Sequence, residues 1–347
     1  MLECREYIAS REPTALDRLT ELNAWLASVL PGRRLRVEPA SADASFRRYF
    51  RVSADGSTWI VMDAPPEHEN CEPFVRIAAL FRDAGLHAPE VLSADLTRGF
   101  LLLTDLGRQT FLHVLREDRS RAPALFADAI GALVTWQTSS RADVLPPYDE
   151  ALLRREVGLF PEWYLGRHLS LDLSDAERTR MAGVFDTVVA NVLAQPRVFV
   201  HRDYMPRNLM ISDPSPGILD FQDAVHGPIT YDVASLMRDA FISWEEPEVL
   251  DWTARYWERA RKAGLPVAQD FSDFYRDMEW MGLQRHLKVL GIFARLYHRD
   301  GKAGYLEDTP RFLGYVRHAA QRYRELQPLL PLLDRIENRA PQVGYTF

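Results

Sequence analysis

The segment His201 to Asp223, HRDYMPRNLMISDPSPGILDFQD, gathers side chains that could handle a phosphate and a metal ion. Asp203 can accept a proton from a hydroxyl group, and Asn208 and Asp220 offer the hard oxygen atoms that Mg²⁺ prefers. A base beside two magnesium ligands suits phosphoryl transfer, in which positive charge offsets the phosphates and a base orients the attacking oxygen. The segment therefore predicts a phosphoryl-transfer site.

Two short apolar stretches flank this loop and must position it. RVFV ends directly before His201, and GILDF carries Asp220; both are typical of short buried strands. Strands on both sides would fix the side chains between them. Taken alone, an Asp-rich loop is more often a solvated turn, and that is the interpretation we keep for Asp213 and Asp223.

Upstream of the loop, residues 35–104 are typical of antiparallel strands with one inserted helix. A leading helix is expected over 14–30, and Asp55-Gly56 is a hairpin-turn signal between two of the strands. The inserted helix would end before Gly85, a typical residue just past a helix C-terminus. The expected strands are LRVEP, SFRRYFRV, TWIVMDAP, PEVLSADL and GFLLLTDL.

Downstream, helical periodicity dominates. The expected helices are 121–138, 148–166, 174–194, 231–243, 247–263, 270–299 and 309–329. The predicted fold class is therefore α+β and bilobal: residues 1–105 form a small antiparallel β lobe, and residues 106–347 form a large helical lobe that contains the loop 201–223. A cleft between two lobes is a preferred place for a ligand.

The overall composition limits the classes of partner that we expect the protein to bind. The 347 residues carry a formal net charge of −7, which argues against nonspecific nucleic-acid binding. The two cysteines, Cys4 and Cys71, form no metal or disulfide pattern, and no apolar run is long enough to span a bilayer. The charged N-terminus is not a signal peptide. We expect a cytoplasmic protein with a small-molecule substrate, no nucleic-acid or membrane partner, and no protein partner needed for chemistry.

HRDYMPRN matches the kinase catalytic-loop pattern H-[RG]-D-x-x-x-x-N, and LDF stands where kinases carry a metal-binding Asp-Phe. ILDFQDAVHGPITYDVASL resembles the aminoglycoside phosphotransferase branch. With SADASFRRYFRV, IVMDAPPE, FLLLTDLG and QRHLKVLGIFARLYHRDGK, most of the chain resembles the bacterial anomeric kinases of N-acetylmuramate and N-acetylglucosamine in cell-wall recycling. The resemblance implies a protein-kinase-like fold, ATP, Mg²⁺ and an amino-sugar substrate. Residues 1–105 would then bind the nucleotide, and residues 106–347 would carry the catalytic loop and the sugar-binding helices.

The resemblance also implies roles for individual residues. They are the catalytic base Asp203, the loop-bracing His201, the magnesium ligands Asn208 and Asp220, and the adenine-binding connector residues Thr104, Asp105 and Leu106. Asp232 would be structural, because an Asp at a helix N-terminus stabilises free N–H groups.

Two departures from the family pattern concern the nucleotide. The phosphate-covering loop lacks glycine and reads SADAS, in which Ser41 and Ser45 offer hydroxyl donors. The third strand has Met62 where a lysine is usual. Arg48, which shares a strand face with Phe50, is our candidate for the missing cation; a structural ion pair is the equally weighted alternative.

The spacing after the metal ligand bears on the acceptor. Asp220 and Asp232 are 12 residues apart, and no Ala-Pro-Glu follows. A protein kinase needs a longer activation segment there to dock a peptide and to be switched. The spacing therefore favours a small-molecule acceptor.

Substrate residues are expected in the basic stretch 284–302, where Arg285 and His286 would suit an acid-bearing sugar. Arg238 is a further candidate, and Trp244 could cover a sugar face. For most of the basic stretch, a solvated helix face is the simpler interpretation.

Three rival functions remain open. One is a kinase for aminoglycosides or another small alcohol on the same scaffold. The second is a nucleotide-binding pseudokinase, suggested by the absent strand lysine. The third is a non-catalytic helical interaction module, which would show no Mg²⁺-dependent nucleotide effect on melting temperature.

Overall fold

The computed structural model describes residues 15–42 and 46–339. The chain divides into two compact units, and the division passes through helix α2 (Glu72–Asp83). The first unit is Met1–Ala79 with Pro89–Asp105, and the second is Leu80–Ala88 with Leu106–Phe347. Each unit is described by itself below.

The first unit is built on a five-stranded antiparallel sheet in the order β1-β2-β3-β5-β4. Its strands are β1 (Arg36–Ala42), β2 (Arg48–Ala54), β3 (Ser57–Asp63), β4 (Val91–Asp95) and β5 (Phe100–Thr104). The β2–β3 hairpin turns at Asp55 and Gly56, whose φ angles are 51° and 78°. Two successive positive φ angles favour Asp-Gly, as the sequence predicts.

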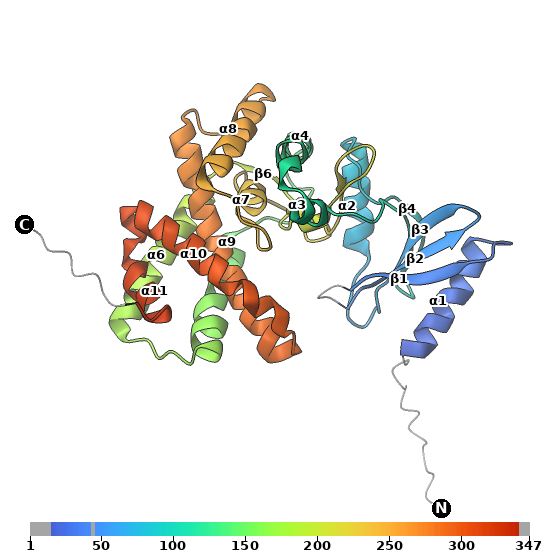
Figure 1. Ribbon diagram of the computed structural model, residues 1–347, viewed down its shortest axis with the longest axis horizontal. Helices are drawn as coiled ribbons and strands as arrows, with labels where there is room; N and C mark the ends of the chain where they lie inside the picture. The colour runs from blue at the N-terminus through green and yellow to red at the C-terminus, as the bar shows by residue number, and fades with distance from the viewer. Residues whose placement is uncertain (1–14, 43–45, 340–347) are drawn as a thin grey trace, which may run out of the picture. The chain divides into compact units, whose positions relative to one another are not determined.

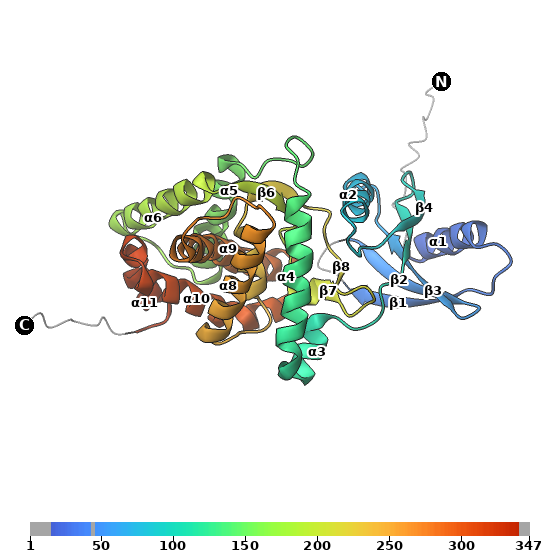
Figure 2. The same cartoon turned by 90° about the horizontal axis from the view of Figure 1, so that it is seen from above.

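Helix α1 (Ala15–Val29) covers one face of this sheet (Figures 1 and 2). Its i, i+3, i+4 spacing turns one apolar stripe toward the strands. The shared core consists of Leu22, Trp25, Leu26, Val52, Val61, Phe100 and Leu102. Because α1 covers this face of the sheet, β2, β3 and β5 contribute apolar side chains to the core.

The inserted helix α2 ends as the sequence predicts. Its last residue is Asp83, and Gly85 has a φ of 74°, which a residue with a side chain rarely adopts. The N–H of Gly85 donates to the carbonyl of Arg82 and that of Leu86 to the carbonyl of Phe81. These bonds satisfy carbonyls that the last helical turn leaves free.

The second unit is mainly helical. Its helices are α3 (Phe111–Glu117), α4 (Ala122–Thr138), α5 (Glu150–Leu159), α6 (Asp175–Ala194), α7 (Tyr231–Met237), α8 (Glu246–Lys262), α9 (Phe271–Asp300), α10 (Thr309–Arg322) and α11 (Leu330–Ile336). A small antiparallel sheet part followed by a large helical part confirms the predicted fold class. Among the residues that the structure describes, no helix is long and apolar enough to cross a membrane.

Helix α9 lies at the centre of this unit and contacts α5, α6, α7 and α10. It starts at the N-cap Asp270, whose side chain accepts from the N–H of Ser272, and stops at Gly301, which has a φ of 68°. Gly291 lets the backbone of α5 approach closely, since an added Cβ would lie 2.4 Å from the carbonyl carbon of Leu159. Such crowding would force the two helices apart.

Three predicted helices differ from the observed ones at their C-terminal ends. The helix expected over 309–329 ends at Arg322 and is followed by a 3₁₀ helix, Arg324–Leu329. The helix expected over 148–166 is α-helical only to Leu159 and continues as a π-helical turn, Phe160–His168, because Pro161 cannot donate a backbone hydrogen bond. The helix expected over 231–243 ends at Met237. There the side chain of Asp239 accepts from the N–H of Ala240, which competes with continued helix.

Two small antiparallel pairs interrupt the helices and frame the loop identified from the sequence. Strand β6 (Arg197–Val200) pairs with β9 (Val225–Pro228), and β7 (Leu209–Met210) pairs with β8 (Gly217–Ile218). The strand expected at RVFV is confirmed. The second strand is shorter than expected, so Asp220 lies just beyond β8 instead of within it.

Candidate active site

His201 joins both ends of the loop. Its ring is fully buried; Nδ1 accepts from the N–H of Asp203 at 3.2 Å, and Nε2 donates to the carbonyl of Leu219 at 3.0 Å. Burial lowers the pKa of His201 to about 4, so the ring is neutral and keeps one donor and one acceptor. His201 therefore ties the position of Asp203 to the residue before Asp220.

Asp232 braces the same loop from the start of α7. Its carboxylate accepts from the backbone N–H of His201 at 2.7 Å and of Arg202 at 3.0 Å. Burial raises the pKa of Asp232 to about 7, although the two N–H donors act in the opposite direction. The expectation that Asp232 serves its own helix end is corrected: the N–H groups it satisfies belong to the loop.

Asn208 and Asp220 lie side by side. The amide nitrogen of Asn208 donates to the carbonyl of Asp203 at 2.8 Å and to Oδ2 of Asp220 at 3.2 Å. These two bonds fix the orientation of the amide, so Oδ1 is the atom that could bind a metal ion. Oδ1 of Asp220 accepts from Gln222 at 2.8 Å, and the backbone φ of Asp220 is 62°. An amide oxygen beside a fixed carboxylate fits the donor set of Mg²⁺.

Asp203 is accessible, and a buried cation lies next to it. The Asp203 side chain is 45% exposed, whereas that of Arg285 on α9 is 3% exposed. A guanidinium nitrogen of Arg285 lies 4.0 Å from Oδ1 of Asp203. An exposed carboxylate beside a fixed positive charge can take up a proton from an incoming hydroxyl group.

The sequence did not reveal the buried network behind the loop. Arg202 has a φ of 78° and turns its guanidinium inward, 2.5 Å from Glu156 on α5. Lys288 on α9 lies 3.0 Å from the same carboxylate, and Tyr148 donates its hydroxyl to it. Lys288 also donates to the hydroxyl of Tyr231 at 3.0 Å. Arg202, the residue before Asp203, is therefore held by Glu156, and Lys288 and Tyr148 hold Glu156 in turn.

Ionisation of this network follows from its pairing. Burial alone would raise the pKa of Glu156, but Lys288 and Arg202 bring it below its ordinary value. The network was detectable in principle: helical spacing puts Glu156 on one face with Leu153 and Val157, both buried. A charged residue in such an apolar stripe is typical of a buried pair.

In the first unit, Arg48 has a structural partner. It donates to Oδ2 of Asp63, and Arg18 of α1 donates to Oδ1 of the same carboxylate at 3.1 and 2.5 Å. Asp63 is fully buried. The structure therefore places Arg48 in an ion pair with Asp63, which was the alternative that the sequence left open. Ser45 lies outside the described residues, and Ser41 is described only as backbone in β1.

The connector residues have side-chain roles of their own. The Asp105 carboxylate binds Arg51 in a two-pronged pair, at 2.6 and 2.9 Å. Thr104 accepts from the N–H of Glu90 through its hydroxyl at 2.9 Å, and Leu106 is buried. These contacts fix the connector; adenine recognition by its backbone stays a prediction.

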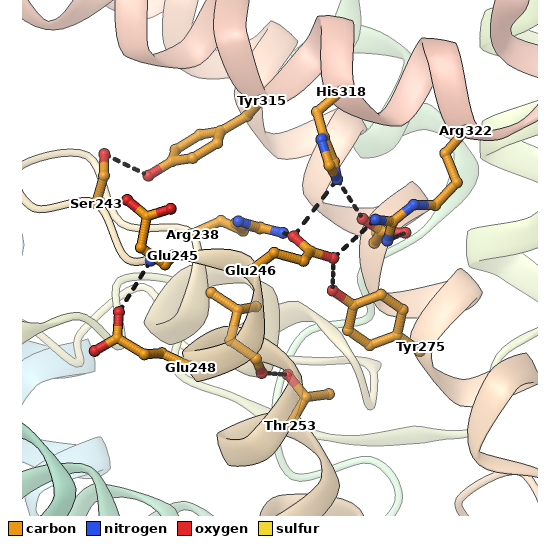
Figure 3. Close-up of polar contacts among 12 residues, drawn as sticks. Arg238, Ser243, Glu245, Glu246, Glu248, Thr253, Tyr275, Tyr315, His318 and Arg322 are labelled. Atoms are coloured by element: carbon orange, nitrogen blue, oxygen red, sulfur yellow. Dashed lines mark hydrogen bonds and ion pairs between the residues drawn. The ribbon is translucent and has the colours of Figure 1, made fainter.

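The remaining substrate candidates are largely committed to the interior. Figure 3 shows Arg238, Tyr275, His318 and Arg322 converging on Glu246. Trp244 is 5% exposed and packs edge-on against Trp252 at 5.0 Å, and His286 is 3% exposed. These side chains pack within the helical unit; their contact with a substrate stays a prediction.

Comparison with known proteins gives consistent matches. The family model described as the phosphotransferase enzyme family (APH) matches residues 36–271. A Pseudomonas aeruginosa protein named N-acetylmuramate/N-acetylglucosamine kinase is 53% identical, covering 93% of this chain and 98% of the relative. A Neisseria meningitidis protein of the same name is 48% identical, covering 96% and 100%.

Solved structures share the fold at low identity. Choline kinase LicA from Streptococcus pneumoniae superposes with a TM-score of 0.62 at 14% identity, covering 87% of this chain and 99% of that one. The gentamicin complex of APH(2")-IIa superposes with a TM-score of 0.57 at 12% identity, covering 84% and 95%. A kinase-type loop, a matching fold and close relatives agree, and the chain therefore belongs to the phosphotransferase enzyme family.

Proposed function

We propose that this protein transfers the γ-phosphoryl group of ATP to the anomeric hydroxyl of N-acetylmuramate and N-acetylglucosamine, giving the sugar 1-phosphates. The observation that carries the proposal is the intact catalytic loop, with Asp203 beside the paired Asn208 and Asp220, in a chain about half identical to kinases named for these two sugars. We place the reaction in cytoplasmic recycling of peptidoglycan sugars.

The chain's own residues perform the proton transfer. Asp203 takes the proton of the anomeric hydroxyl as that oxygen forms its bond to the γ-phosphorus and the bond to the β-phosphate oxygen breaks. Arg285, 4.0 Å away, offsets the negative charge of Asp203 in the resting state. His201 and Asp232 keep the base in place through the loop backbone.

Asn208 and Asp220 would hold Mg²⁺. When bound, the ion offsets the negative charge of the phosphates and so favours attack on phosphorus. The carboxylate of Asp220 accepts hydrogen bonds from two amide donors, those of Asn208 and Gln222, which hold it in place for this purpose. ATP is the phosphoryl donor that the family's chemistry suggests.

The rival functions are less well supported. An aminoglycoside carries several positive charges and needs an acidic wall, whereas Arg285 lies beside the base here. A pseudokinase or an interaction module has no need for a base and two metal ligands fixed by so many hydrogen bonds.

The deciding experiment is phosphorus NMR of the protein with Mg²⁺·ATP and each amino sugar. We expect a sugar 1-phosphate signal with both sugars, none with choline or kanamycin, and at least ~10²-fold slower turnover for Asp203→Asn. Asp223→Asn, an exposed acid in the same segment, is the matched control. Product on another hydroxyl, or on none, would overturn the proposal.

A further inference from the structure

Arg207 lies in the catalytic loop, between the base and the first metal ligand, and is half-buried. Its guanidinium lies over the ring of Phe241, 4.7 Å from the ring centroid. Arg207 forms no salt bridge with any of the described residues, 15–42 and 46–339. A stacked guanidinium keeps its in-plane N–H donors available, because the ring occupies only its face.

The other arginines near the loop are already engaged. Arg202 is paired with Glu156, and Arg238 with Glu246. Arg285 is buried against Asp203. Of these four arginines, Arg207 is therefore the one whose positive charge is available to an acceptor.

Phe241 is presented by a segment that is firmly held. Residues 238–245 connect α7 to α8 without regular structure, yet the hydroxyl of Tyr315 donates to Oγ of Ser243 at 3.0 Å (Figure 3). Arg311 donates to the same hydroxyl oxygen at 2.6 Å, and Arg119 donates to the carbonyl of Ser243 at 2.6 Å. Because the segment is fixed, the ring can hold Arg207 in one orientation.

The geometry points to Arg207, stacked on Phe241, as the residue that binds a carboxylate substituent of the acceptor sugar. This inference rests on the proposed function. N-acetylmuramate differs from N-acetylglucosamine by a lactyl ether with a carboxylate on C3, two ring positions from the anomeric carbon C1. Arg207 follows Asp203 by four residues, at most about 14 Å of extended chain. The two Cα atoms are therefore close enough for both extended side chains to contact one sugar.

A planar guanidinium suits this task, since it can bind both carboxylate oxygens at once. Hydrogen bonds to charged groups contribute ~10- to 100-fold in affinity. Arg207 would therefore set the preference between the two sugars and leave the chemistry at Asp203 to the rest of the loop.

The test compares kcat/KM for both sugars in Arg207→Leu. We expect a ~10- to 100-fold loss with N-acetylmuramate and a far smaller change with N-acetylglucosamine, with an intermediate effect for Arg207→Lys, which keeps the charge without the planar fork. Arg261→Leu is the matched control, because Arg261 lies over Trp257 at 4.6 Å on the exposed side of α8. It should change neither value.

Two outcomes would overturn the inference. Equal losses with both sugars would assign Arg207 to the transferred phosphate or to loop structure, and unchanged values would make it a solvated side chain. Failure of the proposed function is distinguishable, since the unmodified protein would then phosphorylate neither sugar. A melting temperature measured for each variant checks that the fold is intact.

Discussion

Arg285 holds a guanidinium nitrogen 4.0 Å from a carboxylate oxygen of Asp203, and of the two side chains only that of Asp203 is open to solvent. Arg285 can therefore influence the base directly but offers little surface to a bulky substituent. The basic residue that the sequence suggested for sugar recognition is better explained as a partner of the base.

We expect Arg285→Met to lower kcat by at least ~10-fold, by the same factor with both sugars, because the Asp203 carboxylate loses the buried positive charge that helps to orient it. Steady-state kinetics with each sugar checks this. A loss confined to N-acetylmuramate would show instead that Arg285 contacts the lactyl carboxylate.

Asp220→Asn should remove magnesium-dependent nucleotide binding without distorting the loop. Asn tolerates the left-handed backbone that Asp220 adopts, with its φ of 62°. We expect the Mg²⁺ concentration for half-maximal activity to rise at least ~10-fold, and the rise in melting temperature with Mg²⁺·ATP to disappear. An unaltered magnesium requirement, with Asp223→Asn alongside, would exclude Asp220 as a ligand.

Glu156→Gln should destabilise the second unit. It leaves Arg202 and Lys288 buried without their shared anion, a loss of the kind that costs about 3–5 kcal/mol of unfolding free energy. Urea denaturation measures it, and kcat should fall as Arg202 relaxes. Glu150→Gln on the same helix, where the pair with Arg154 is exposed, should cost less than about 1 kcal/mol.

A double variant separates charge from packing in that network. Adding Lys288→Met to Glu156→Gln removes one of the two uncompensated charges, so the pair of changes should destabilise less than the sum of the single ones. Strict additivity would indicate that Lys288 and Glu156 do not interact in the folded protein.

Acid stability should report the buried His201. Folding lowers its pKa from 6.5 to about 4, so the unfolded chain takes up a proton that the folded ring refuses. The contribution of His201 is thus complete above pH 6.5 and is lost as the pH falls toward 4. The unfolding free energy of the native protein minus that of His201→Gln should shrink over this window by up to about 3 kcal/mol. Folding raises the pKa of Asp232, which changes the unfolding free energy with pH in the opposite direction. Asp232 is present in both proteins, so its contribution cancels in the difference. A constant difference would contradict the burial of a neutral ring.

The catalytic loop was predictable because its information is local. The spacing of Asp203, Asn208 and Asp220 within one short segment indicates a common task, and the structure brings Asn208 and Asp220 within 3.2 Å. The β2–β3 turn was predictable for the same reason, since Asp55 and Gly56 are adjacent. Family membership and the fold class followed from these local patterns and the order of elements.

Contacts between distant segments were not predictable in this way. Arg202 and Glu156 are 46 residues apart, and no spacing rule joins them. Asp232 was expected to serve its own helix, although its partners lie 30 and 31 residues earlier. Periodicity also cannot tell a solvated basic face from a buried one.

The basic stretch of α9 illustrates that ambiguity. Arg285, His286 and Lys288 are buried, whereas His298 and Arg299 are exposed. The solvated face expected for this stretch is therefore wrong for its first half. The first three residues are covered because α9 lies at the centre of the helical unit, which the sequence does not reveal.

The pairing of Arg202 with Glu156 bears on how such an enzyme is controlled. In many regulated kinases the activation loop becomes ordered only after phosphorylation, because the attached phosphate pairs with an arginine. Here the carboxylate of Glu156 supplies the negative charge that pairs with Arg202, and it is in place once the chain has folded. We therefore expect no activation by phosphorylation of this loop. The reaction rate should depend on the concentrations of enzyme and sugar.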